Sequence, residues 1–286
     1  MPRSDGQGRV GYLLGKTGMT VLIVAIAVIC LFPPAIIVST SLKELKDVFK
    51  IPAGWIPTPF AWGNYVEIWD QIPMVQWLYN STVVAVGTIL LSLAIAIPAG
   101  YAFARLRFPG KSVMIMTTLL TQMFSPVIII GPLFRLFKTL HLLNSHIGLI
   151  LGNTAFSLAF STLLMSSFFE MMPKELEDAA LIDGCGRLQS LLRIFIPLAS
   201  SGIFVVSIYI FIQAWNNFLF AFTFISSSEK DILIVGIYKM VQLTTGQMPK
   251  WNYVMVTSVY SSIPIVLLFF LRRRTLARGL TAGAIR

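Results

Sequence analysis

Long apolar runs alternate with shorter polar segments along the whole chain. Six runs reach the roughly 20 residues that a helix needs to cross the hydrocarbon core of a bilayer. They are Met19–Ser39, Leu78–Ala99, Val113–Leu133, Ile147–Phe168, Leu198–Phe220 and Tyr253–Leu271. Several contain proline, such as Pro98 and Pro264, which membrane helices tolerate. The pattern predicts an all-α polytopic membrane protein with six transmembrane helices.

Composition agrees with this class. The 286 residues are 56% hydrophobic and 12% charged, with a mean hydropathy of +0.79. A soluble domain usually carries about 25% charged residues. We assign the net charge of +10 to Lys and Arg beside the spans and expect no nucleic-acid partner, because no basic stripe with interleaved aromatics lies outside them. Two cysteines, Cys30 and Cys185, are too few for a disulfide framework. No metal-ligand pattern surrounds them or the two histidines, His141 and His146.

The basic residues predict the orientation. With the N-terminus inside, the inside segments hold fourteen Lys and Arg and the outside segments hold eight. This excess places both termini in the cytoplasm. Residues 1–17 and 272–286 are then cytoplasmic ends of a transmembrane domain that covers residues 18–271. The first run is longer than the apolar core of a signal peptide and lacks a clear cleavage site, so we expect it to remain as a helix.

Charge is absent from the predicted spans. All twelve carboxylates and all Lys and Arg lie outside them. Ion-coupled carriers, proton relays and voltage sensors place ionisable groups inside the bilayer. The chain is therefore not expected to use an ion gradient, and uphill transport would need another energy source. It also lacks a GKT or GKS phosphate loop, a GxSxG elbow and an HExxH helix, so we predict no catalytic residues.

A charged segment, PKELEDAALIDGCGRLQSLLRIFIPLASSG (residues 173–202), separates the fourth and fifth spans on the predicted cytoplasmic side. Pro173 suits a first helical turn, and the acidic residues that follow favour the positive end of the helix dipole. Asp183-Gly184 predicts a turn, and a second helix is expected over Arg187–Phe195. An amphipathic loop on the headgroups is one reading, but the anionic inner leaflet would repel the acidic cluster. A protein partner with a groove accounts for the acidic cluster as well as for the basic residues Arg187 and Arg193.

The spacing within this segment resembles the EAA loop of binding-protein-dependent ABC importer permeases. That loop has EAA, three residues, Gly, nine residues, Ile, one residue, an aliphatic residue and Pro. The matching positions here are Asp178, Ala179, Ala180, Gly184, Ile194, Ile196 and Pro197. Asp178 replaces the usual Glu, and Ile196 replaces the usual Leu. Stretches such as AGYAFARLRFPGK and WNNFLFAF extend the resemblance over nearly the whole chain, to the shorter six-helix permease of the maltose-type carbohydrate-uptake branch.

The resemblance implies a type I ABC importer permease fold in a bacterial or archaeal cytoplasmic membrane. It implies a homologous second permease, two ATPase subunits that bind ATP and Mg, and an extracytoplasmic solute-binding protein, with no cofactor in this chain. The loop 170–197 would couple to an ATPase through Glu177, Asp178, Ala179, Ala180, Asp183, Gly184, Ile194 and Pro197. The solute would be a sugar, oligosaccharide or polyol. The alternatives are a glycerol phosphate ester or other solute for the same machinery, and a stand-alone carrier or channel.

Polar residues inside three predicted spans follow helical spacing. They are Gln122, Ser125, Asn153, Ser157, Tyr209, Gln213, Asn216 and Asn217. Amides, hydroxyls and aromatic rings suit a neutral polyhydroxy solute in a translocation pathway. The alternative for each single residue is hydrogen bonding between helices, worth about 0.6–2 kcal/mol.

The last outside segment precedes the sixth span. Gln247, Pro249 and Trp251 within it resemble the place where the family's shorter permease meets its binding protein. A simple surface turn is the alternative.

Overall fold

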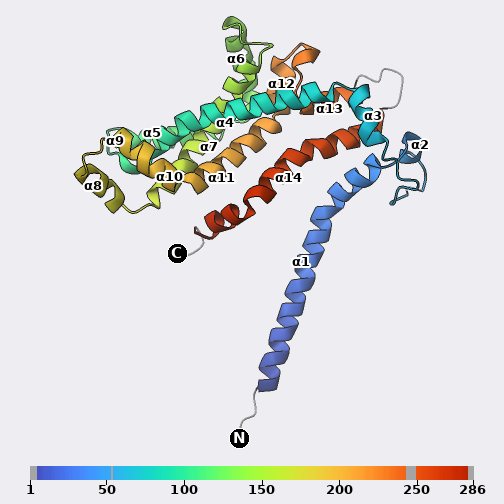
Figure 1. Ribbon diagram of the computed structural model, residues 1–286, viewed down its shortest axis with the longest axis horizontal. Helices are drawn as coiled ribbons and strands as arrows, with labels where there is room; N and C mark the ends of the chain where they lie inside the picture. The colour runs from blue at the N-terminus through green and yellow to red at the C-terminus, as the bar shows by residue number, and fades with distance from the viewer. Residues whose placement is uncertain (1–4, 53, 243–248, 283–286) are drawn as a thin grey trace. The chain divides into compact units, whose positions relative to one another are not determined.

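The computed structural model describes the backbone of residues 5–52, 54–242 and 249–282, and all regular structure in these ranges is helical (Figure 1). The chain forms two compact units. The first comprises the described residues of Met1–Ile72 and Met240–Tyr260, and the second those of Pro73–Lys239 and Ser261–Arg286. The long helix α14 (Trp251–Ala282) contributes to both units.

The first unit contains α1 (Asp5–Ser41), α2 (Leu45–Val48), α3 (Asn64–Gln71) and the start of α14. The buried Asn64 side chain links these helices. The Asn64 amide donates to the carbonyl oxygens of Ser41 at 2.9 Å and Lys43 at 2.8 Å. Its oxygen accepts a 3.2 Å bond from Asn252. These bonds tie the end of α1 and the start of α14 to α3.

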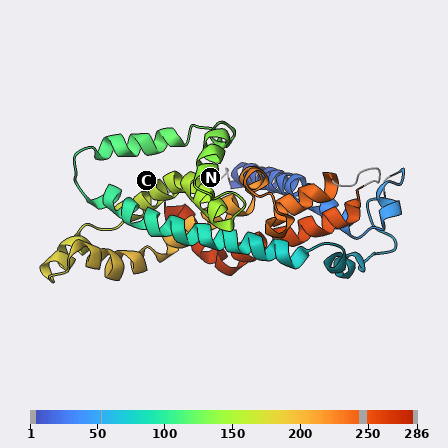
Figure 2. The same ribbon diagram turned by 90° about the horizontal axis from the view of Figure 1, so that it is seen from above.

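The second unit is built on α4 (Met74–Arg105), α7 (His146–Glu170) and α11 (Ser200–Trp215), which pack side by side (Figures 1 and 2). Small residues allow α4 and α7 to approach closely. The buried hydroxyls of Ser92 and Ser157 lie 3.0 Å apart, and Gly100 faces the α7 backbone at Met165 and Ser166. The expected tolerance of proline is confirmed, since α4 continues through Pro98 and α14 through Pro264.

Four described helices are long and apolar enough to cross a membrane, and up to six spans result when each of two bent pairs counts as one. The predicted third span, Val113–Leu133, lies within one of these bent pairs. Helix α5 (Lys111–Thr121) and helix α6 (Pro126–Thr139) meet at 101°, and Figure 2 shows them running in different directions. The physical reason is Pro126, which disfavours helical geometry at the preceding residue; Ser125 is extended, with ψ of 136°.

The predicted fifth span, Leu198–Phe220, is also interrupted. Arg187–Leu198 meets α11 at 79°, and α11 ends at Trp215. A separate helix, α12 (Phe218–Phe224), follows. The Asn217 side chain accepts a hydrogen bond from the backbone N–H of Phe220 and so caps α12.

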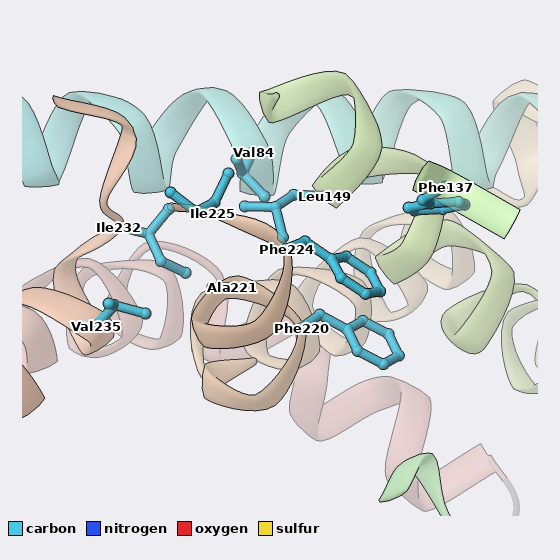
Figure 3. Packing of buried hydrophobic residues seen from close by; sticks show 9 residues of the cluster. All are labelled: Val84, Phe137, Leu149, Phe220, Ala221, Phe224, Ile225, Ile232 and Val235. Atoms are coloured by element: carbon cyan, nitrogen blue, oxygen red, sulfur yellow. The ribbon is translucent and has the colours of Figure 1, made fainter. Parts of the chain in front are cut away.

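A buried apolar cluster packs α12 against α4, α6 and α7 (Figure 3). Its members are Val84, Phe137, Leu149, Phe220, Ala221, Phe224, Ile225, Ile232 and Val235. The rings of Phe220 and Phe224 stack with centroids 5.5 Å apart. Beyond α12 the chain forms a short 3-10 helix, η2 (Ser228–Lys230), and then α13 (Leu233–Gln242).

Candidate functional site

The segment between α7 and α11 has the predicted helix–turn–helix order. It contains α8 (Glu175–Ile182), α9 (Arg187–Ser190), a π-helical turn η1 (Leu191–Phe195) and the short α10 (Ile196–Leu198). The expected second helix therefore exists, but its last five residues adopt π geometry. Gly184 forms the turn with φ of +77°, a conformation that suits glycine because it has no Cβ. We call residues 170–197 the coupling loop.

One side of α8 is open to solvent in this chain. Asp178 and Ala179 are exposed, and the Ile182 side chain is 86% exposed. Ala180 faces the opposite way and is buried. The exposed acidic residues of the first turn, Glu175 and Asp178, flank this surface. The face of α8 thus combines negative charge with a protruding aliphatic side chain.

The coupling loop is fastened to the C-terminal end of α4, near which α8 and α9 lie in Figure 1. The Tyr101 hydroxyl donates to Glu177 Oε1 at 3.2 Å. Arg105 Nη2 donates to the carbonyl oxygens of Phe169 at 2.7 Å and Met172 at 2.5 Å. Phe169 lies in the last turn of α7, and Met172 follows the helix by two residues. A cation here also complements the helix dipole.

Aromatic packing strengthens the same attachment. Phe169 and Phe195 are fully buried, and Tyr101 packs edge-on against both, with centroids 5.9 Å and 5.1 Å away. The Arg105 guanidinium lies 5.3 Å from the centre of the Phe195 ring, within cation–π range. Helix α4 therefore holds the loop at two places, at the end of α7 that leads into it and at η1 within it.

Sequence reasoning did not single out Tyr101 and Arg105 as site residues. Both lie in the stretch AGYAFARLRFPGK, whose family resemblance was the available signal. Of the remaining predicted loop residues, Asp183 and Pro197 are exposed, while Glu177 and Ile194 are half-buried.

The predicted pathway residues fall into two groups. Asn153 and Asn217 come together, since the Asn217 amide donates to Asn153 Oδ1 at 2.6 Å, and Ser157 pairs with Ser92. These contacts are the interhelical bonds of the alternative interpretation. The second group consists of the other five residues. Gln122 and Ser125 are exposed at the bend between α5 and α6, Gln213 and Asn216 are exposed, and Tyr209 packs against Phe160 with centroids 4.6 Å apart.

The predicted binding-protein contact is described only in part. Gln247 lies outside the described residues. Pro249 and Trp251 are half-buried at the start of α14, and the Trp251 N–H donates to the Pro249 carbonyl at 2.8 Å.

Comparison with known proteins now decides the family. Residues 96–281 match the family described as binding-protein-dependent transport system inner membrane component. The chain belongs to this family. It is a membrane transport component rather than an enzyme, and the predicted family, all-α fold and class of function are confirmed.

Three relatives are similar over most of their length. The sulfoquinovosyl glycerol permease SmoH of Agrobacterium fabrum is 35% identical, over 90% of this chain and 89% of its own. The trehalose/maltose permease MalG of Thermococcus litoralis is 31% identical, over 92% of this chain and 94% of its own. The sn-glycerol-3-phosphate permease UgpE of Yersinia pestis is 31% identical, over 91% of this chain and 93% of its own.

The fold is also that of a solved ABC transporter. A chain of a bacterial importer for the acidic polysaccharide alginate matches with a TM-score of 0.79 and 23% identity, covering 96% of this chain and 99% of that one. This likeness supports the type I importer permease fold of the inner-membrane component.

Proposed function

We propose that this chain is one of two homologous permeases of an ATP-driven importer, and that the coupling loop docks on an ATPase subunit. Such an importer would also need an extracytoplasmic binding protein, as the family description indicates. ATP and Mg would be held by the ATPase subunits. The positive-inside excess supports cytoplasmic termini and a cytoplasmic coupling loop.

The observation that carries this proposal is the exposed face of α8. Ile182 is 86% exposed beside exposed acidic residues, whereas the opposite face is fastened to α4. Burying one such side chain in a partner contributes about 1.5–3 kcal/mol. The acidic first turn would steer a basic rim of the partner towards this side chain. A groove with an apolar floor and a basic rim is therefore the complementary surface.

The proposed solute is a sugar, oligosaccharide or polyol. SmoH and MalG carry such solutes in their names, and the uncharged amides and hydroxyls of the predicted pathway suit a neutral ligand. A glycerol phosphate ester is the second candidate, favoured by the similarity to UgpE. The predicted pathway residues, and Gln247, Pro249 and Trp251 at the binding-protein contact, remain part of this proposal.

The test replaces residues at the coupling surface. Gly184→Pro forces φ to about −65° where the chain needs +77°, and Asp178→Lys reverses an exposed charge. Both variants should lose uptake and co-purify with less ATPase, while remaining inserted in the membrane. Gly110→Pro is the matched control, because Gly110 also has positive φ, +82°, and a Cβ there would also meet nothing within 4 Å. Full uptake by both coupling-loop variants would refute the docking role.

The solute class is tested on the same complex. ATP hydrolysis is measured with the binding protein and either maltose, trehalose or glycerol 3-phosphate. Stimulation by a disaccharide supports the first candidate, and stimulation by glycerol 3-phosphate alone supports the second.

A further inference from the structure

We propose that α4 is the rod that transmits movement of the coupling loop to the opposite side of the membrane, with Tyr101 and Arg105 as positioning residues at one end and Asn80 at the other. This inference rests on the proposed function of the coupling loop. It follows from hydrogen bonds at both ends of a single helix within the second unit.

At its C-terminal end, α4 holds the coupling loop at three places. Tyr101 binds Glu177 on α8, and Arg105 binds the end of α7 and lies over Phe195 of η1. A tilt of α8 without α4 would break the bond between Tyr101 and Glu177, and a shift of η1 without α4 would remove the packing of Phe195 against Tyr101. Movement of the docked loop is therefore expected to carry the end of α4 with it.

At its N-terminal end, α4 holds the segment that leads into α13. The buried Asn80 amide donates to the carbonyl oxygens of Glu229 and Asp231, both at 2.9 Å. The buried Ser81 hydroxyl accepts a 2.8 Å bond from the Leu233 N–H. A buried amide that loses its partners pays a desolvation cost, so this segment should follow α4 rather than detach from it.

Close packing of the same segment leaves little room for slip. Gly236 of α13 lies against the Trp77 ring, and a Cβ at Gly236 would fall 2.4 Å from ring carbons. The buried Asp231 carboxylate also binds Lys239 at 2.6 Å, which fixes the start of α13 to its last turn. Along the chain, α13 precedes the residues predicted to contact the binding protein.

The helix between the two ends is continuous. It has 32 residues, which corresponds to about 48 Å at 1.5 Å per residue. Its packing against α7 at Ser92 and Gly100 opposes bending. A second route exists through α7, because Asn144, two residues before α7, also bonds Ser227 and Lys230. Tyr101 and Asn80 both belong to α4. Substituting them therefore weakens the route through α4 and leaves the bonds of Asn144 on the α7 route in place.

The experiment uses the full complex with its partner permease and ATPase subunits in lipid nanodiscs. Backbone hydrogen exchange is measured with and without Mg-ATP and vanadate, which trap the ATPase. The variants are Tyr101→Phe, which removes one hydroxyl and keeps the ring, and Asn80→Ala at the other end. Tyr79→Phe is the matched control, since Tyr79 is on α4 with a 66% exposed side chain.

In the unaltered complex we expect trapping to change exchange in residues 175–190 and in residues 228–239. Tyr101→Phe and Asn80→Ala should keep the first change and lose at least half of the second, and Tyr79→Phe should keep both. The proposed role of α4 is refuted if trapping changes hydrogen exchange in residues 228–239 of both variants as it does in the unaltered complex. It is also refuted if, in the unaltered complex, trapping changes hydrogen exchange in residues 175–190 but not in residues 228–239. Failure of the ATPase to co-purify would instead reject the proposed function on which the rod rests.

Discussion

Replacing Gly100 by alanine is expected to push α4 and α7 apart beside the coupling loop. A Cβ at this position would lie 2.7 Å from Met165 Cβ, 2.9 Å from Ser166 N and 3.1 Å from Met165 C. These atoms belong to the α7 main chain or are fixed to it, so no rotamer change relieves the overlap. Overpacking of this kind costs about 1–3 kcal/mol. Alanine recovers about 1 kcal/mol through its helix propensity, leaving a net loss of roughly 0–2 kcal/mol.

Gly87→Ala is the matched control on the same pair of helices. Its Cβ would meet Ile150 Cδ1 at 2.5 Å, which is the far end of a flexible side chain that can turn away. The gain in helix propensity is the same at both sites, so the difference between the variants isolates the main-chain overlap.

The assay is thermal unfolding of the purified complex. Gly100→Ala should unfold at a lower temperature than Gly87→Ala, by roughly 2–4 °C for each kcal/mol of difference in unfolding free energy. Equal stability of the two variants would refute the close approach of α4 and α7 at Gly100.

Two further predictions concern buried polar contacts. Asp231→Ala leaves the partly buried Lys239 ammonium unpaired and should lower the unfolding free energy by about 3 kcal/mol. The loss is measured as a drop in unfolding temperature, and an unchanged temperature would mean that the ion pair does not form. Asn217→Ala removes both the bond to Asn153 and the cap of α12, at about 1 kcal/mol for the cap, whereas Asn153→Ala removes only the bond. Asn217→Ala should therefore be the less stable variant in the same assay, and the reverse order would contradict the capping role.

Local sequence signals predicted much of the fold. Four apolar runs of sufficient length became long helices, and the spacing around Gly184 located the turn of the coupling loop. The bend at Ser125 lies beside Pro126, a residue that local rules mark as prone to kink a helix, but neither proline nor apolar length gives the angle of 101°.

The attachments of the candidate site could not be predicted in the same way. Tyr101 and Glu177 are 76 residues apart, and Asn153 and Asn217 are 64 apart. Periodicity places each residue on a helix face, but it does not say which faces meet. The polar spacing of Asn153 and Asn217 fitted both a solute pathway and an interhelical bond, and only the packing of α7 against the break between α11 and α12 shows that the two amides touch.

Transport by reconstituted liposomes tests the source of energy most directly. The chain and its partner permease are inserted with or without the ATPase subunits, and accumulation of maltose or glycerol 3-phosphate is followed with binding protein outside and ATP inside. The account predicts accumulation above the external concentration only when the ATPase is present, and its loss with Gly184→Pro. Accumulation by the two permeases without any ATPase would contradict it.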